Sequence, residues 1–343
     1  MKKFSLILTI VLVLSLLCGC AGTTVVYQTN CTCPTGSHDV TVEAAPEATT
    51  APEATPETVP ADQIVSGAVK TGLAMVTGIK VEEEKASYDV TFVAVNVDDN
   101  GVITACAIDS LGADVATADI AGANGEVKTK QELGYDYNMI TYGGAKYEWF
   151  EQANFLAEFA VGKTVEELKA GAMGENADVD LVSCATIYLG GYVSAIEKAV
   201  ANAQHLGAMA GDELKLASVN SLKEGSLNSD AVALTMKDGA ITSCYLDSLQ
   251  ASLSVAEDGT ISAGNTMTKN ELGYDYNMIT YGGAKFEWFE QAANFAAYIT
   301  GKTVADVSGI AVNESTYPTD ADLTATCTIA IGGFQALIAK AAQ

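Results

Sequence analysis

The segment ELGYDYNMITYGGAK at residues 132–146 recurs without a single change at residues 271–285. In both copies it continues as EWFEQA and is followed by GKTV, which begins at Gly162 in the first copy and at Gly301 in the second. The copies lie about 140 residues apart, far more than the roughly 20 to 50 residues of solenoid repeats. We therefore expect two whole domains in tandem.

The duplication and the composition around it divide the 343 residues into five segments. We interpret residues 1–20 as a lipoprotein signal peptide and residues 21–63 as a tether rich in Pro, Thr, Glu and Ala. The first repeat then occupies residues 64–203, a linker residues 204–211, and the second repeat residues 212–343. Each repeat is long enough to bury a core and contains its own strands and helices, so we expect each to fold alone.

Each repeat opens with strands. In the first copy, residues 88–97 alternate as a strand, and a turn ending at Gly101 leads into a second strand at residues 102–108. The corresponding turn in the second copy ends at Gly239. The residues expected on one face of the second strand are Val102, Thr104, Cys106 and Ile108.

Helices follow in the second half of each repeat. Aromatic and apolar residues at helical spacing predict an amphipathic helix at residues 146–161. Capping boxes open shorter helices at Thr164 and at Thr303, and a final helix is expected at residues 192–203. Strands that precede helices predict the α+β class, with two tandem copies of a small domain built from an antiparallel sheet and helices.

The first residues resemble a targeting signal. Lys2 and Lys3 precede an apolar run at residues 4–18 that is too short to stay in a bilayer as a spanning helix. The run leads into LCGC at residues 17–20, which resembles the lipobox of bacterial lipoproteins and implies that Cys20 is the lipid-modified mature N-terminus. An ordinary secretory signal is the alternative. We expect a lipid-anchored protein on the extracytoplasmic face of the cell membrane.

The charge of the chain restricts its ligands. The formal net charge is −25, and all eighteen basic residues are lysines. Nucleic acid is therefore not expected as a partner, because binding phosphate backbones requires a basic surface. Without arginine, a phosphorylated ligand must be held by lysines, by backbone N–H groups or by a covalent bond.

Hydrolytic and zinc-dependent catalysis lack the residues that they need. The two histidines are His38 in the tether and His205 in the linker, and neither recurs between the repeats. The cysteines are scattered and do not suggest a disulfide framework, and Cys31 and Cys33 are too close for easy pairing. With His38 they would form an adventitious metal clip at most. We expect free thiols, no resident metal, and a carrier or binding protein in preference to an enzyme.

The sequence DLVSCATIYLGGY at residues 180–192 resembles the flavin-attachment motif of the FMN-binding domain family. That family includes the C subunit of the sodium-pumping NADH:quinone oxidoreductase and surface flavoproteins of extracellular electron transfer. In its motif an Asp precedes Ser-Gly-Ala-Thr, and the Thr hydroxyl is esterified to the FMN phosphate. The matching positions here are Asp180, Ser183, Ala185, Thr186, Gly191 and Tyr192 in the first copy, and Asp322, Ala325, Thr328, Gly333 and Phe334 in the second.

The resemblance implies the FMN-binding fold for both repeats, covalent FMN at Thr186 or Thr328, and a flavin transferase as a partner. The glycine of the motif is replaced by Cys184 in the first copy and by Thr326 in the second. A glycine lets the backbone approach a phosphate, whereas a side chain would crowd it. The alternative is that both threonines are structural, capping a helix or pairing with the edge of a strand.

The unchanged block is a second candidate ligand site. Its tyrosines could stack on a flat ligand, and its paired glycines, which precede the expected helix at residues 146–161, could offer N–H groups to an anion. The residues concerned are Tyr137, Tyr142, Gly143 and Gly144 in the first copy and Tyr276, Tyr281, Gly282 and Gly283 in the second. The alternative is a packing motif of aromatic side chains and glycine turns.

Two functions are compatible with these features. One is a flavin-carrying lipoprotein that passes electrons to redox partners outside the membrane. The other is a cofactor-free lipoprotein that uses the same fold to bind a ligand or to build structure.

Overall fold

The computed structural model describes residues 67–175 and 177–343. The expected signal peptide, Cys20, the tether with His38, and residues 64–66 lie outside the described residues. Within the described part, every helix is too short or too polar to cross a membrane.

The first repeat consists of three antiparallel strands in the order β1-β2-β3, followed by helices. The strands are β1 (Lys70–Val81), β2 (Lys85–Val97) and β3 (Ile103–Ala116). A short 3₁₀ helix, η2 (Thr117–Asp119), follows β3. The later elements are α1 (Lys130–Leu133), the 3₁₀ helix η3 (Gly134–Tyr137), α2 (Met139–Gly143), α3 (Trp149–Ala160), α4 (Val165–Met173), α5 (Val179–Cys184) and α6 (Leu189–Ala201).

The second repeat follows the same plan. Its strands are β5 (Glu213–Lys223), β6 (Ser226–Lys237) and β7 (Ala240–Ala251), and β4 (Gly125–Glu126) from the first repeat pairs with β5. A hairpin of β8 (Leu253–Val255) and β9 (Ile261–Ala263) is added. Its later elements are α7 (Lys269–Leu272), the 3₁₀ helix η4 (Gly273–Tyr276), α8 (Met278–Gly282), α9 (Trp288–Ile299), α10 (Val304–Ser308), α11 (Ala321–Thr324) and α12 (Gly332–Ala341). The predicted α+β class is confirmed.

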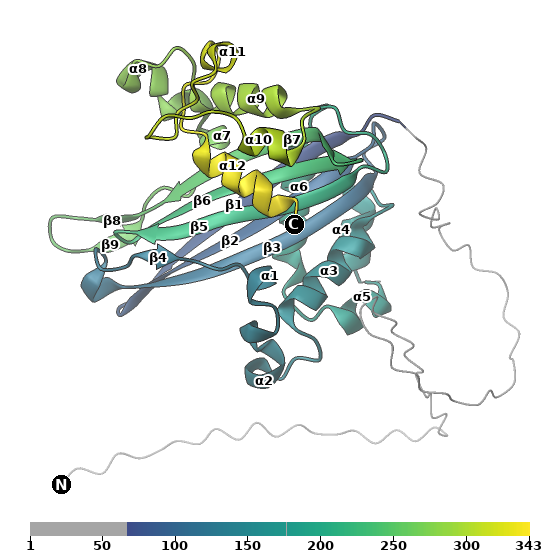
Figure 1. Ribbon diagram of the computed structural model, residues 1–343. Helices are drawn as coiled ribbons and strands as arrows, with labels where there is room; N and C mark the ends of the chain where they lie inside the picture. The colour runs from purple at the N-terminus through teal and green to yellow at the C-terminus, as the bar shows by residue number, and fades with distance from the viewer. Residues whose placement is uncertain (1–66, 176) are drawn as a thin grey trace, which may run out of the picture. The chain divides into compact units, whose positions relative to one another are not determined.

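The elements form four layers, with the two sheets inside and the helices outside (Figure 1). One core lies between β1–β3 and the helices α3 and α6, and a second lies between β5–β7 and the helices α9 and α12. A third core lies between the two sheets. There, Tyr88 and Phe92 of β2 are fully buried together with Leu227 of β6 and Leu249 of β7.

This middle core argues against the expectation that each repeat folds alone. Each sheet is apolar on both faces, and one face of each sheet packs against the other repeat. A separated repeat would expose side chains such as Phe92 to water, at a cost of about 25 cal/mol for each Å² of apolar surface. We therefore treat residues 67–343 as one folding unit.

Two ion pairs join the repeats in a reciprocal way. Lys340 of α12 pairs with Glu132 of α1, and Lys198 of α6 pairs with Glu271 of α7. Burial alone would raise the pKa of Glu132, but the hydrogen bonds from Lys340 and from the Thr129 N–H outweigh it, so that pKa is lowered. Glu132 and Glu271 are the first residues of the unchanged block, so each block is held by the last helix of the other repeat.

The strands differ from the sequence prediction in two respects. β1 and β5 were not predicted, and a register shift at Asn96 changes which residues of β3 face the helices. Ile103 joins Cys106 and Ile108 at the helix-facing core, instead of the expected Val102 and Thr104. β3 contains one extra residue, Thr104, in a β-bulge opposite Asn96 and Val97. N-terminal to this bulge, the side chains of β3 that would have faced the helices face the other way.

The helices begin close to where the sequence indicated. The capping boxes at Thr164 and Thr303 are confirmed. The long helix starts at Trp149 instead of residue 146, because Glu148 forms a capping box with Glu151.

Candidate functional site

A cavity of about 530 Å³ lies beside Thr186 in the first repeat. One wall comes from β1 and β2, another from the start of α3, and a third from the loop that leads into α6. The cavity therefore joins the two segments that the sequence indicated, the Thr186 loop and the unchanged block. Its lining residues are Val76, Gly78, Asp89, Thr91, Lys130, Tyr137, Met139, Trp149, Thr186, Ile187, Tyr188, Gly191 and Tyr192.

The Thr186 loop is fixed by the buried side chain of Gln152 on α3. Its Oε1 accepts hydrogen bonds from the Thr186 N–H at 2.7 Å, from the Ile187 N–H at 3.1 Å and from the Thr186 hydroxyl at 3.1 Å. Its Nε2 donates to the carbonyl of Tyr147 at 2.8 Å and lies 3.5 Å from the sulfur of Met139. One amide thus ties the threonine loop to the unchanged block.

The second repeat has the same arrangement. Gln291 Oε1 accepts from the Thr328 N–H at 2.7 Å and from the Thr328 hydroxyl at 3.0 Å. Its Nε2 donates to the carbonyl of Phe286 at 2.8 Å and lies 3.6 Å from the sulfur of Met278. The structural role left open for the threonines is therefore present in both copies, although each whole threonine residue remains exposed.

A buried glutamate organises the unchanged block. Glu148 accepts hydrogen bonds from the N–H groups of Met139, at 2.7 Å, and Ile140, at 3.1 Å. Glu287 makes the same two bonds, to Met278 and Ile279. These carboxylates occupy the N-termini of α2 and α8, where a negative charge is favoured. The packing-motif interpretation thus has a defined basis in both copies.

The glycines of the block lie at the opposite end of these short helices. Gly143 is the last residue of α2, and the N–H of Gly144 donates to the carbonyl of Ile140 at 3.1 Å. In the second copy, Gly282 ends α8 and the N–H of Gly283 bonds to Ile279 in the same way. The expectation that these glycines bind an anion is therefore corrected, because they end a helix and the Gly144 and Gly283 N–H groups are already bonded.

The tyrosines of the block separate into two groups. Tyr137 lines the cavity, and the ammonium of Lys130 lies 5.2 Å from its ring centroid and 5.3 Å from that of Trp149. The counterpart Lys269 lies 5.1 Å from the rings of both Tyr276 and Trp288. These are cation–π contacts.

Tyr142 and Tyr281 project outward instead, with 87% and 86% of their surface exposed. They do not line the cavity beside Thr186.

Ser183 and Cys184 precede Thr186 in the sequence, and neither of them lines the cavity. The Ser183 hydroxyl donates to the carbonyl of Asp180 at 3.0 Å. Cys184 is buried and disulfide-bonded, so the expectation of free thiols is wrong at this position. Cys106, Cys244 and Cys327 are free. Cys184 does not line the cavity, which removes the expected crowding by its side chain.

Sequence reasoning missed Gln152, Glu148 and Lys130 as site residues. The first two lie in EWFEQA, the part of the repeated sequence just beyond the block, and Lys130 has its counterpart in Lys269. Their recurrence in both copies was the available signal. Within the described residues, no group of three or more His, Cys, Asp or Glu side chains is placed to hold a metal ion.

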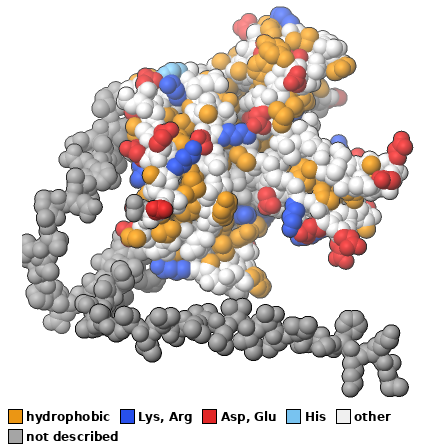
Figure 2. Space-filling model, turned by 180° about the vertical axis from the view of Figure 1, so that it is seen from behind, with side chains coloured by type: hydrophobic (Ala, Val, Ile, Leu, Met, Phe, Trp, Pro, Cys, Tyr) orange, Lys and Arg blue, Asp and Glu red, His pale blue; other side chains and the backbone are white. Residues whose placement is uncertain are grey.

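The face drawn in Figure 2 shows acidic, basic and apolar side chains interspersed. The described part of this face offers no continuous basic surface to nucleic acid. Comparison of the chain with protein-family models, with curated proteins and with solved structures found no match in any of the three.

Proposed function

We propose that this chain is a membrane-anchored extracytoplasmic lipoprotein whose first repeat carries FMN on Thr186 for electron transfer. The observation that carries the proposal is the cavity beside Thr186, where an exposed hydroxyl, aromatic rings and a lysine converge. When bound, the flavin would supply the redox chemistry, and the protein would supply attachment, orientation and electrostatics.

The residues present fit an aromatic phosphate ester. The cavity volume lies within the range of about 300 to 1,000 Å³ that is typical of small-molecule sites. Tyr137 and Tyr188 are exposed and offer ring faces or edges to a flat ligand, while the buried Trp149 backs the cavity wall. Lys130 brings a positive charge, and α6 begins at the cavity with Gly190 and Gly191 in its first turn, where N–H groups lack partners within the helix.

Gln152 is a positioning residue in this proposal. It holds the Thr186 hydroxyl at 3.1 Å and the two loop N–H groups at 2.7 and 3.1 Å. Transfer from a flavin dinucleotide would break its phosphoanhydride bond and release the nucleotide together with the Thr186 hydroxyl proton. Only the hydrogen bond from the hydroxyl to Gln152 would be lost. The two N–H bonds to Gln152 remain and would keep the loop in place.

The second repeat is less suited to carry the group. Ala330 and Phe334 stand where the first repeat has Tyr188 and Tyr192. The start of α12 is also covered, because the N–H of Ile331 donates to the carbonyl of Thr316 at 2.9 Å. A Cβ at Gly332 would lie only 2.7 Å from the Cβ of Thr316. We therefore propose Thr186, in preference to Thr328, as the attachment residue.

The remaining parts of the proposal concern partners. The lipid on Cys20 would anchor the chain to the membrane, a flavin transferase would load Thr186, and redox partners would exchange electrons with the flavin. The second candidate function is a cofactor-free binding module. It is favoured by the carboxylate of Asp89 in the cavity, which opposes an anionic ligand, and by the strongly exposed Tyr142 and Tyr281.

Co-expression with a flavin transferase tests the two functions against each other. The purified wild-type protein should be yellow and should keep its flavin absorption after denaturation and gel filtration. Thr186→Ala should be colourless, whereas the matched variant Thr328→Ala should stay yellow. If the wild-type protein is colourless and also fails to bind free FMN, the flavin function is excluded and the cofactor-free binding module is the function that stands.

A further inference from the structure

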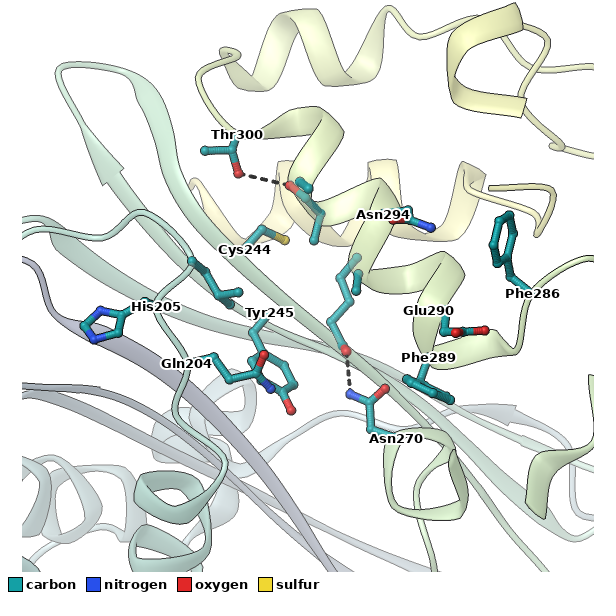
Figure 3. A pocket seen from close by; sticks show the side chains of 15 residues that line it. Gln204, His205, Cys244, Tyr245, Asn270, Phe286, Phe289, Glu290, Asn294 and Thr300 are labelled. Carbon is teal, nitrogen blue, oxygen red and sulfur yellow. Dashed lines mark hydrogen bonds between the residues drawn. The ribbon is translucent and has the colours of Figure 1, made fainter. Parts of the chain in front are cut away.

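A second cavity, of about 820 Å³, lies in the other repeat (Figure 3). It is bounded by α9, by the strand β7 and by the segment that links the two repeats. It shares no lining residue with the cavity beside Thr186. The flavin proposal assigns it no role.

The first repeat contains a smaller and more charged version of the same cavity. That version measures about 390 Å³ and is lined by Asn154 and Glu158 of α3. Their counterparts on α9 are Ala293 and Ala297, which line the larger cavity. The larger cavity thus has two alanines where the smaller one has an amide and a carboxylate, and it has Asn294 at the position of Phe155.

The walls of the large cavity combine apolar surface with amide groups. Phe286 and Phe289 form an aromatic side, while Asn270, Asn294 and Gln204 carry amides (Figure 3). Asn270 donates to the carbonyl of Leu246 at 2.9 Å and Asn294 to that of Thr326 at 3.2 Å. Each amide has further hydrogen-bonding capacity beyond that single bond.

The charge of the walls selects against anions. The residues that line the cavity include no lysine. Glu290 contributes a carboxylate, which accepts a hydrogen bond from the N–H of Glu287 at 2.8 Å. The chain as a whole carries a formal charge of −25, which also disfavours an anionic ligand.

We propose that this cavity binds an uncharged, flat and largely apolar small molecule with hydrogen-bonding groups at its edge. The aromatic side takes the face of the ring system, and the amides of Asn270 and Asn294 take its polar edge. The small side chains of Ala293 and Ala297 provide the space.

Fluorescence titration with Nile red, an uncharged flat dye, tests the proposal on the purified full chain. The wild type should bind one dye saturably, with a blue-shifted emission. The double variant Ala293→Asn, Ala297→Glu restores the residues of the first repeat and should weaken binding at least about tenfold, since filling an apolar pocket by a single group already costs that much. Because these residues occupy the same positions on α3, the fold should tolerate them.

The matched control is Ala336→Glu, which adds the same charge to an exposed position of α12 outside the cavity. It should bind Nile red like the wild type, and the anionic dye ANS should bind the wild type at least about tenfold more weakly than Nile red. Absence of saturable Nile red binding would overturn the proposal. The proposal would also be overturned if the double variant melted like the wild type and bound Nile red with the same affinity. Equal affinity of the wild type for Nile red and ANS would overturn it too.

Discussion

Replacement of Gln152 by leucine measures how much the threonine loop depends on one buried amide. The substitution keeps the approximate volume but removes the acceptor of the Thr186 and Ile187 N–H groups and the donor to the Tyr147 carbonyl. A buried polar group that loses its partner costs about 1 to 3 kcal/mol. The Ile187 N–H is buried, whereas water can reach exposed Thr186, so we expect a loss of about 2 to 4 kcal/mol in the free energy of unfolding.

Urea unfolding of the purified protein gives this loss from the shift in midpoint at constant slope. Gln152→Glu should also lose stability near neutral pH, because its buried carboxylate would carry an unpaired charge and face the Tyr147 carbonyl oxygen. This loss should shrink at low pH, where the neutral acid can donate to Tyr147 again. Gln291→Leu is the matched variant in the second repeat. It should reduce the free energy of unfolding somewhat less, because the Gln291 Oε1 accepts from one backbone N–H whereas the Gln152 Oε1 accepts from two. A loss below about 1 kcal/mol for Gln152→Leu would refute the role assigned to this amide.

Three further predictions concern the core, the pH dependence and the anchor. Phe92→Ala, in the core between the sheets, should cost about 3 to 5 kcal/mol and lower one common melting transition, and two separate transitions by calorimetry would contradict a shared core. Burial raises the pKa of Asp247 from 3.8 to about 7. Because the folded state therefore holds this proton more tightly, stability should fall as the pH rises from about 4 to about 7, and Asp247→Asn should flatten that slope in urea midpoints. A slope unchanged in the variant would exclude Asp247 as its source. Cys20→Ala should release the protein from the membrane fraction or leave the precursor uncleaved, and an immunoblot showing normal processing and retention would argue against lipidation there.

The fold was predictable where local signals were strong. The capping residues Thr164 and Thr303 marked helix starts correctly, because a capping box is a local hydrogen-bond pattern. The first strands, β1 and β5, escaped prediction. The middle core also escaped prediction, although the continuous apolar run at residues 92–95 of β2 is the local sign of a strand covered on both faces. The run does not say that a second sheet provides the cover.

The candidate site was predictable where a sequence motif or a repeated segment marked its residues. The resemblance selected Thr186 and the repetition selected Tyr137, and both line one cavity. The repetition alone could not distinguish Tyr137 from Tyr142, which projects into solvent. The role of Gln152 depends on contacts across 34 residues of sequence, which only the folded chain brings together.

The most direct test of the central proposal is peptide mass spectrometry of protein co-expressed with a flavin transferase. We predict that the peptide containing Thr186 carries the added mass of an FMN phosphoester and that Thr186→Ala abolishes it. The peptide containing Thr328 should carry little or none. An unmodified Thr186 peptide in protein that is correctly folded, or the flavin mass on the Thr328 peptide alone, would contradict the assignment of the flavin to the cavity of the first repeat.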